Sequence, residues 1–243
     1  MVATEGPSTA FGGPPPLEIE GRIWVCRMLS DYILFIDGEA LVLDKPAGLP
    51  VDAPRRGGES IASRVDELRC GFARPPTPMH RLDTDTSGCL LFARNAKARA
   101  RFQHAFEART VETYYIAVVG AELADPEGMI DAPLGKVSSA EAGWRMVRDD
   151  AHGLQATTMW RRLAIRDGAT LVQFQPLTGR THQIRAHARE AFGRGIVGDR
   201  VYGIPGGPML LHASRLVVPR EGKPAIDVTA PLPEYFGEWR DAA

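Results

Sequence analysis

Short runs of apolar residues, separated by polar turns, recur along most of the chain. Residues 33–36 (ILFI) and 40–43 (ALVL) flank Asp37-Gly38, a dipeptide that favours a two-residue β-hairpin turn. Residues 88–93 (GCLLFA) are apolar throughout, which is typical of a buried strand. Further strands are expected at Tyr114–Val119, Ala169–Leu177, Val201–Gly203 and Leu210–Val218, and residues 121–153 read as a loop-rich stretch.

Apolar residues at helical spacing predict three helices. The first extends from Ser60 to about Cys70, with its apolar residues on one face. The second begins after Asn95, a good N-cap, and carries two phenylalanines four residues apart. The third follows a Thr178-Gly179-Arg180 turn, with Thr181 as the expected cap, and extends to about residue 192.

Many short strands, few helices and the lack of a βαβ rhythm predict an α+β fold. Residues 1–20 are rich in Gly, Pro and Ser and are expected to form a disordered tail, which leaves residues 21–243 for a single domain. No apolar run is long enough to span a bilayer, and the start of the chain does not resemble a secretory signal. A cytoplasmic protein is therefore expected.

Composition adds little. The net charge is −1, so overall charge does not point to nucleic acid. Only four of the 29 basic residues are lysine, and arginine is better suited to phosphate, although genomic base composition explains this ratio equally well. Cys26, Cys70 and Cys89 fit neither a disulfide framework nor a zinc site and are expected to be reduced.

Two polar segments carry the candidate chemistry. Residues 79–88 (MHRLDTDTSG) form a loop that leads directly into the buried strand, so the core would hold the loop rigid. Residues 177–187 (LTGRTHQIRAH) place a turn and a helix N-terminus beside several arginines, an arrangement suited to an anion. Each segment by itself also fits a solvated turn or a solvated helix.

Together these segments resemble the RluA-type pseudouridine synthases, over roughly residues 33–235. Four blocks carry the resemblance, in the order found in that family. They are residues 43–48 (LDKPAG), 80–83 (HRLD) with 86–88 (TSG), 178–185 (TGRTHQIR), and 198–203 (GDRVYG) with 211–213 (LHA). The resemblance implies an α+β catalytic domain with a central, mostly antiparallel mixed sheet and a cleft across it, here without a separate N-terminal RNA-binding domain.

The resemblance also implies the catalytic residues. Asp83 corresponds to the essential aspartate, Arg185 to the arginine that pairs with it, and Tyr115 to the tyrosine that stacks on the target base. One carboxylate can attack the sugar or remove a ribose proton, so neither a cofactor nor a metal ion is expected. Asp85 is a rival carboxylate, and Thr113 stands where the family usually has lysine.

Structured RNA, either large-subunit ribosomal RNA or tRNA, is the expected partner of a monomeric enzyme. Arg81 is expected to hold the flipped-out nucleotide or to fill its place in the stack. Lys45, Arg180 and Arg189 are candidate phosphate contacts. His80 is grouped with these RNA-binding residues, although it is expected to brace the loop rather than to exchange protons.

Two alternatives remain open at this stage. A metal-dependent hydrolase would use some of the six histidines, but His182 and His187 are five residues apart rather than the four that align two ligands on a helix. A non-catalytic RNA-binding module derived from the enzyme would be expected to lack Asp83, Tyr115 or Arg185, and all three are present.

Overall fold

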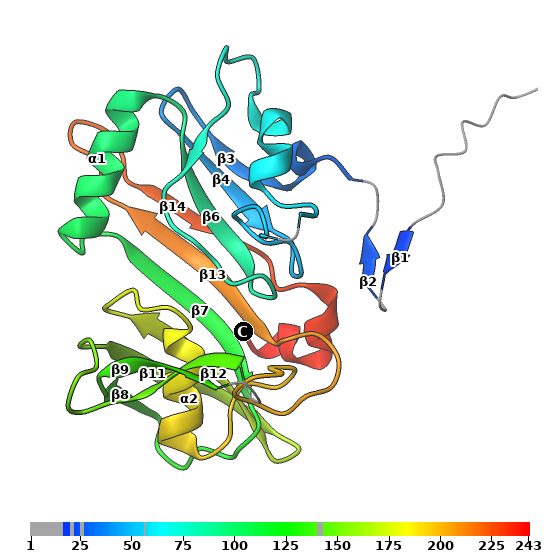
Figure 1. The fold of residues 1–243 in the computed structure, drawn as a ribbon, viewed down its shortest axis with the longest axis vertical. Helices are drawn as coiled ribbons and strands as arrows, with labels where there is room; N and C mark the ends of the chain where they lie inside the picture. Colours follow the sequence, from blue (N-terminus) through cyan, green and yellow to red (C-terminus); the bar gives the residue numbers. More distant parts are fainter. Residues whose placement is uncertain (1–16, 20–21, 25–26, 56, 140–142) are drawn as a thin grey trace, which may run out of the picture.

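The computed structural model describes residues 17–19, 22–24, 27–55, 57–139 and 143–243 (Figure 1). Most of the predicted tail, residues 1–16 and 20, lies outside these ranges, as does Cys26. Within the predicted tail, Leu17–Ile19 form strand β1, which pairs with β2 (Arg22–Trp24). The prediction of a disordered tail did not include this strand.

Ten of the described strands form one mixed sheet. Its main path runs β3-β4-β6-β13-β7-β12-β11-β8, with β14 paired to β13 and β5 paired to β6. Among these pairings β6 with β13 is parallel, and the others are antiparallel. The predicted α+β fold with a mostly antiparallel sheet is therefore confirmed. The strands are β3 (Ile33–Ile36), β4 (Ala40–Lys45), β5 (Thr77–Pro78), β6 (Ser87–Ala93), β7 (Glu112–Val119), β8 (Glu127–Asp131), β11 (Thr157–Arg166), β12 (Ala169–Pro176), β13 (Leu211–Val218) and β14 (Ile226–Thr229).

The predicted hairpin at the start of the sheet is confirmed, with its turn shifted by one residue. The Asp37 amide donates to the Ala40 carbonyl at 2.9 Å, so the two turn residues are Gly38 and Glu39. One Asp37 carboxylate oxygen also accepts from the Glu39 and Ala40 amides, both at 2.8 Å. An aspartate that caps its own turn in this way explains why the sequence signal is strong.

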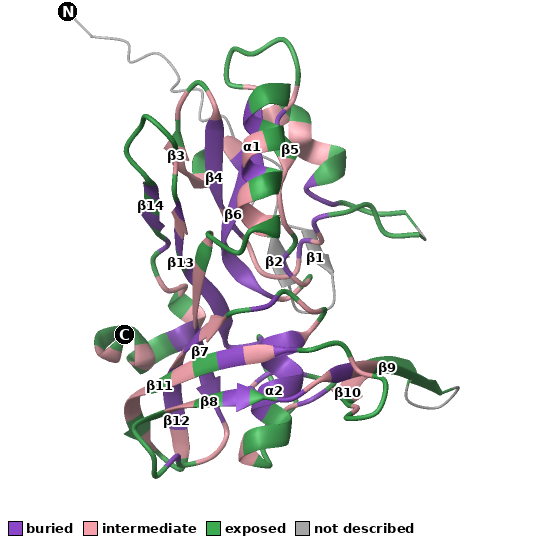
Figure 2. Cartoon of the chain, turned by 90° about the vertical axis from the view of Figure 1, so that its left-hand side faces the viewer, coloured by how far each residue is buried: buried purple, intermediate pink, exposed green. Residues whose placement is uncertain are grey.

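The expectation of a loop-rich stretch over residues 121–153 is wrong. It contains β8 and a separate two-stranded hairpin of β9 (Leu134–Ser139) and β10 (Gly143–Arg148), and β11 follows it. Figure 2 shows this hairpin extending away from the main sheet with much of its surface exposed. Neither strand buries a full face, so the sequence lacks the alternation of apolar and polar residues by which a strand is recognised. Glycine, serine and charged residues occupy many of these positions. Conversely, the predicted strand at residues 201–203 is a turn.

Two of the three predicted helices are α-helices. α1 (Ala96–Glu107) begins as expected, with the Asn95 side chain accepting from the Ala98 amide. α2 (Gln183–Phe192) begins after His182 rather than after the predicted cap Thr181. The third, η2 (Ala62–Leu68), is a 3₁₀ helix, as are η1 (Leu29–Tyr32) and η3 (Glu234–Ala242).

Strand β7 lies near the centre of the sheet, and its side chains contribute to the packing on both faces. Alternate side chains point to opposite faces. Ala117 and Val119 pack in a cluster with residues of α2, while Ile116 and Val118 pack in a cluster with Phe236 of η3. The α2 face and the η3 face are therefore distinct surfaces, and the candidate residues on α2 belong to the first.

A glycine at the crossing of β6 and β13 holds the 79–88 loop against the sheet. Gly88 has φ +105°, and a Cβ atom there would lie 2.2 Å from the Ala213 carbonyl oxygen. No other residue fits this close parallel contact without a shift of the backbone. The buried strand β6 therefore begins at a fixed point on β13, which anchors the loop that carries Asp83.

Candidate active site

Two segments separated by about a hundred residues meet through Asp83 and Arg185. Arg185 Nη1 donates to Asp83 Oδ2 at 2.8 Å. Asp83 lies on the loop before β6 with its side chain 27% exposed, and Arg185 lies on the first turn of α2 with its side chain 10% exposed. The expected carboxylate–guanidinium pair is thus present, with the carboxylate partly open to solvent. The charge of the rival Asp85, like that of Asp83, contributes to the environment of Lys45.

The other side of the Arg185 guanidinium is held by a second carboxylate. Asp199 is fully buried and accepts from Arg185 Nε at 2.7 Å and Nη2 at 2.8 Å. Its Oδ1 also accepts from the backbone amides of Val201 at 2.8 Å and Tyr202 at 3.1 Å. Burial alone would lower the pKa of Arg185, but Asp199, aided by Asp83, raises it. The guanidinium therefore stays charged, and its third nitrogen is aimed at Asp83.

Tyr115 lies on β7 on the α2 face of the sheet. Its ring is half-buried and packs against both hydrophobic clusters on that face. Burial raises the pKa of the Tyr115 phenol, and the nearby Asp83 charge adds to the rise, while the Thr113 side chain opposes it. The phenol therefore remains protonated at neutral pH beside the candidate carboxylate. The three residues Asp83, Arg185 and Tyr115 are brought together as the sequence implied.

His182 is an additional residue at this site. Its Nε2 lies 3.8 Å from Asp83 Oδ2, and its Nδ1 lies 3.0 Å from the Tyr202 hydroxyl. Trp144 from strand β10 stacks on the imidazole with ring centroids 4.7 Å apart. The His182 backbone has φ +52°, in the left-handed region that a non-glycine residue rarely adopts. Strained backbone of this kind often occurs at functional sites.

His80 supports the loop, as expected. Its Nε2 accepts from the Leu91 amide at 3.0 Å, and its ring packs on Phe106 of α1. Burial lowers the His80 pKa to about 4, so the ring is neutral at physiological pH. With one ring nitrogen bonded to β6, His80 braces the loop, and its grouping with the RNA-binding residues is not supported by its position.

The expectation that Lys45 contacts a phosphate is wrong. Its side chain is fully buried, and Nζ donates to the carbonyls of Pro46 and Leu49 at 2.8 Å and of Thr84 at 3.1 Å. Burial lowers the pKa of this ammonium to about 7, although the charges of the neighbouring aspartates oppose the shift. Lys45 therefore ties the turn after β4 to the loop that carries Asp83.

The other candidate RNA contacts remain near the surface. Arg81 is exposed, with Nε 3.1 Å from an Asp52 carboxylate that is also exposed. Arg180 donates to the Gln155 carbonyl at 3.0 Å. Arg189 is exposed on α2 and donates to the Gly193 carbonyl at 2.8 Å. These positions are compatible with phosphate contacts, and their role in RNA binding stays a prediction.

Sequence reasoning placed none of Asp199, His182, Tyr202 and Trp144 at this site, and it considered His182 only as a metal ligand. Asp199 and Tyr202 fall within the GDRVYG block, and His182 within TGRTHQIR, so a search for polar residues inside these blocks would have found three of them. Trp144 had no such signal, because it lies in the stretch that reads as a loop.

The part of the chain that the structure describes contains neither a metal-ligand cluster nor a membrane-spanning helix. Within that part of the chain, His, Cys, Asp and Glu side chains form no group of three or more able to hold a metal ion. His187 bonds instead to Thr158 and to the Ala132 carbonyl. Among the helices described, none has the length and apolar character needed to cross a bilayer. The described cysteines, Cys70 and Cys89, are free.

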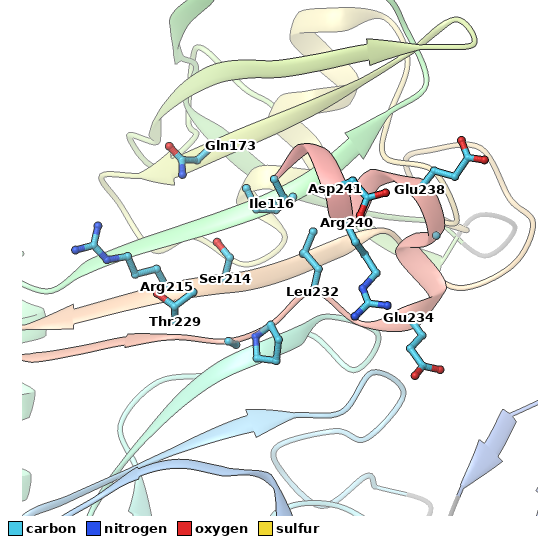
Figure 3. Close-up of a pocket in the computed structure, with 14 residues that line it drawn as sticks. Ile116, Gln173, Ser214, Arg215, Thr229, Leu232, Glu234, Glu238, Arg240 and Asp241 are labelled. Atoms are coloured by element: carbon cyan, nitrogen blue, oxygen red, sulfur yellow. The ribbon is translucent and has the colours of Figure 1, made fainter.

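A separate pocket lies on the other face of the sheet. It has a volume of about 940 Å³ and is bounded by η3 and by strands β7 and β13 (Figure 3). Ile116 contributes to its lining. Because Ile116 points away from the α2 face, this pocket is separate from the site around Asp83.

Comparisons with known proteins agree on one family. Residues 39–190 match the family model described as RNA pseudouridylate synthase. The chain is 46% identical over 213 residues to an uncharacterized RNA pseudouridine synthase of Zymomonas mobilis, covering 86% of this chain and 97% of that protein. It is 31% identical over 218 residues to ribosomal large subunit pseudouridine synthase C of Rickettsia bellii, covering 86% of this chain and 71% of that protein.

A solved structure has the same fold. The human RNA pseudouridylate synthase domain containing 4 aligns with a TM-score of 0.72 and 25% sequence identity, over 86% of this chain and 91% of that one.

Proposed function

This chain belongs to the RNA pseudouridine synthase family, and on that premise we propose that it isomerises specific uridines in ribosomal RNA or tRNA, with Asp83 as its catalytic carboxylate and without a cofactor. The observation that carries the proposal is the 2.8 Å contact between Asp83 Oδ2 and Arg185 Nη1, made beside Tyr115. The family membership does not favour the metal-dependent hydrolase.

The proposed chemistry requires one carboxylate. The bond from ribose C1′ to N1 of uracil breaks, the base rotates, and a bond from C1′ to C5 forms. C5 loses a proton and N1 gains one, so there is no net oxidation or reduction. An ionised Asp83 serves in two ways that satisfy this balance, as a nucleophile at C1′ or as a base that removes a ribose proton.

The neighbouring side chains support this role. Arg185 fixes the orientation of Asp83 and balances its charge from a buried position. The Tyr115 ring offers an apolar surface, with a protonated hydroxyl, on which a flipped-out uracil can stack. Arg81, Arg180 and Arg189 would contact the RNA backbone outside the site, and such contacts make binding weaken steeply as salt increases.

The class of RNA is to be determined by mapping. Pseudouridines in ribosomal RNA and tRNA would be compared between strains with and without the gene. The purified protein should then restore the missing modification without an added cofactor, and it should do so as a monomer. Relatives named for the large ribosomal subunit make that RNA the first to examine. Tight RNA binding without any isomerisation would instead favour the non-catalytic binding module.

The role of Asp83 is tested with a matched pair of variants. Asp83→Asn should lower turnover by at least about 1,000-fold, because the amide neither attacks C1′ nor accepts a proton, while RNA affinity stays near that of the wild type. Asp85→Asn makes the same change two residues away and should retain most of the activity. Full turnover by Asp83→Asn, measured by release of tritium from 5-tritiated uridine in RNA, would refute the assignment.

A further inference from the structure

The hydrogen bonds around Tyr202 favour one of the two neutral tautomers of His182. The Met146 amide donates to the Tyr202 hydroxyl oxygen at 2.8 Å. The phenol proton is then available for the other neighbour of that oxygen, His182 Nδ1, at 3.0 Å. An imidazole nitrogen that accepts a hydrogen bond carries no proton, so in a neutral ring the proton lies on Nε2.

The same ring is held in one orientation. Trp144 stacks on one face with an interplanar angle of 26°, and the Tyr202 ring meets the imidazole edge-on with an interplanar angle of 90°. The left-handed backbone of His182 fixes the point from which the side chain extends. In this orientation Nε2 lies 3.8 Å from Asp83 Oδ2, which is the oxygen that Arg185 also contacts.

The surroundings favour the neutral ring. Burial lowers the His182 pKa below its usual value. The negative charges of Asp83 and Asp199 oppose this shift, while the positive charge of Arg185 reinforces it. A neutral ring with one acceptor and one donor matches the two partners that the fold supplies, the Tyr202 hydroxyl and the Asp83 carboxylate.

We propose that His182 is a positioning residue of this enzyme, a neutral imidazole that Tyr202 holds as the Nε2–H tautomer so that its single N–H is directed at Asp83 Oδ2. The proposal rests on the proposed function, because it assigns His182 a role in orienting the catalytic carboxylate. Arg185 and His182 approach the same oxygen of Asp83, Oδ2.

The tautomer is tested directly by long-range ¹H–¹⁵N NMR of protein labelled with ¹⁵N-histidine at neutral pH. His182 is assigned by the loss of its signals in His182→Asn, since asparagine tolerates the left-handed backbone. The wild-type ring should be neutral with its proton on Nε2. In Tyr202→Phe, which removes only the hydroxyl, the preference should be lost and protonation of Nδ1 should appear.

Kinetics test the role. Tyr202→Phe and His182→Asn should each lower kcat about tenfold, the effect of losing one hydrogen bond in the transition state, with KM for RNA within about twofold of the wild type. Tyr114→Phe removes a phenol hydroxyl that bonds to Glu112 on the surface, and it should leave both tautomer and kcat unchanged. The thermal midpoint of each variant separates loss of fold from loss of turnover.

A wild-type ring protonated on Nδ1 or on both nitrogens would overturn the proposal, as would wild-type kcat in Tyr202→Phe or in His182→Asn. The NMR result does not depend on turnover. An enzyme that isomerises no uridine in any RNA would therefore refute the proposed function and leave the tautomer measurable by itself.

Discussion

At Arg185, each nitrogen of the guanidinium has a defined acceptor. Nε and Nη2 bond to Asp199, and Nη1 bonds to Asp83. The turn that carries Asp199 is closely packed, since Gly198 has φ +81° and a Cβ atom there would lie 1.9 Å from the Pro208 carbonyl oxygen. The orientation of Arg185 toward Asp83 is therefore set by a rigid turn outside α2.

Asp199→Asn should destabilise the protein because it leaves a buried guanidinium without its main counter-charge. Removing one partner of a buried ion pair costs about 3–5 kcal/mol, whereas exposed pairs contribute about 0–1 kcal/mol. Asp227→Asn is a matched control, since Asp227 makes the same two-pronged contact with Arg215 at the surface. Urea denaturation should show a loss of about 3 kcal/mol for Asp199→Asn and less than about 1 kcal/mol for Asp227→Asn. Equal losses would contradict this account.

Lys45 shows how a sequence block can be correct while the role of its residue is wrong. A lysine next to a Pro-Ala-Gly turn suggests a surface cation, and its charge alone suggested a phosphate contact. The fold instead encloses the ammonium between the 45–49 turn and the loop at Thr84. Burial of this kind depends on segments that are far apart in sequence, so local pattern did not reveal it.

At the scale of elements, the β9–β10 hairpin joins the site without joining the main sheet. A lone two-stranded hairpin is marginally stable in water. This one is held to the α2 side by the stack of Trp144 on His182 and by the hydrogen bond from Met146 to Tyr202, and Arg148 Nη1 lies 3.7 Å from a Glu190 carboxylate of α2. The hairpin is largely exposed to solvent, and it contacts the residues beside Asp83 through Trp144 and Met146.

Trp144→Ala should loosen this hairpin while leaving the main sheet intact. An aromatic stack contributes about 0.5–1.5 kcal/mol. Amide hydrogen exchange over residues 134–139 and 143–148 should accelerate about fivefold, with unchanged exchange in β6 and β13. Val137→Ala, which shortens another exposed apolar side chain of the same hairpin, is the control and should exchange like the wild type. Uniform acceleration across the whole sheet would show that Trp144 has a global role.

At the scale of the whole molecule, a buried polar network joins the C-terminal segment to the strand crossing. Ser87 Oγ lies 2.8 Å from His212 Nδ1 and 2.8 Å from the Tyr235 hydroxyl of η3. His212 is fully buried, and burial lowers its pKa to about 4. The network lies at the crossing of β6 and β13, the same crossing that anchors the loop carrying Asp83.

This burial makes stability depend on pH. The His212 pKa is about 4 in the folded protein and near 6.5 in the unfolded chain, so the folded state binds fewer protons in between. The free energy of unfolding therefore falls as pH falls through that window, with about 2 kcal/mol lost between pH 7 and pH 5 through His212 alone. His212→Gln should reduce the pH dependence by that amount in urea titrations. His152→Gln, at an exposed histidine, should change it little.

The sequence by itself determined the fold class, the first hairpin, strand β6 and helix α1, and the family resemblance pointed to Asp83, Tyr115 and Arg185 as the candidate site. Each of these depends on local signals, such as hydrophobic periodicity and cap residues, or on long gapless motifs. Only the tertiary structure revealed that Asp199 holds Arg185, that Lys45 is buried, and that Trp144 reaches His182. These contacts join segments distant in the chain, and the hairpin strands lack the buried face that gives a strand its pattern.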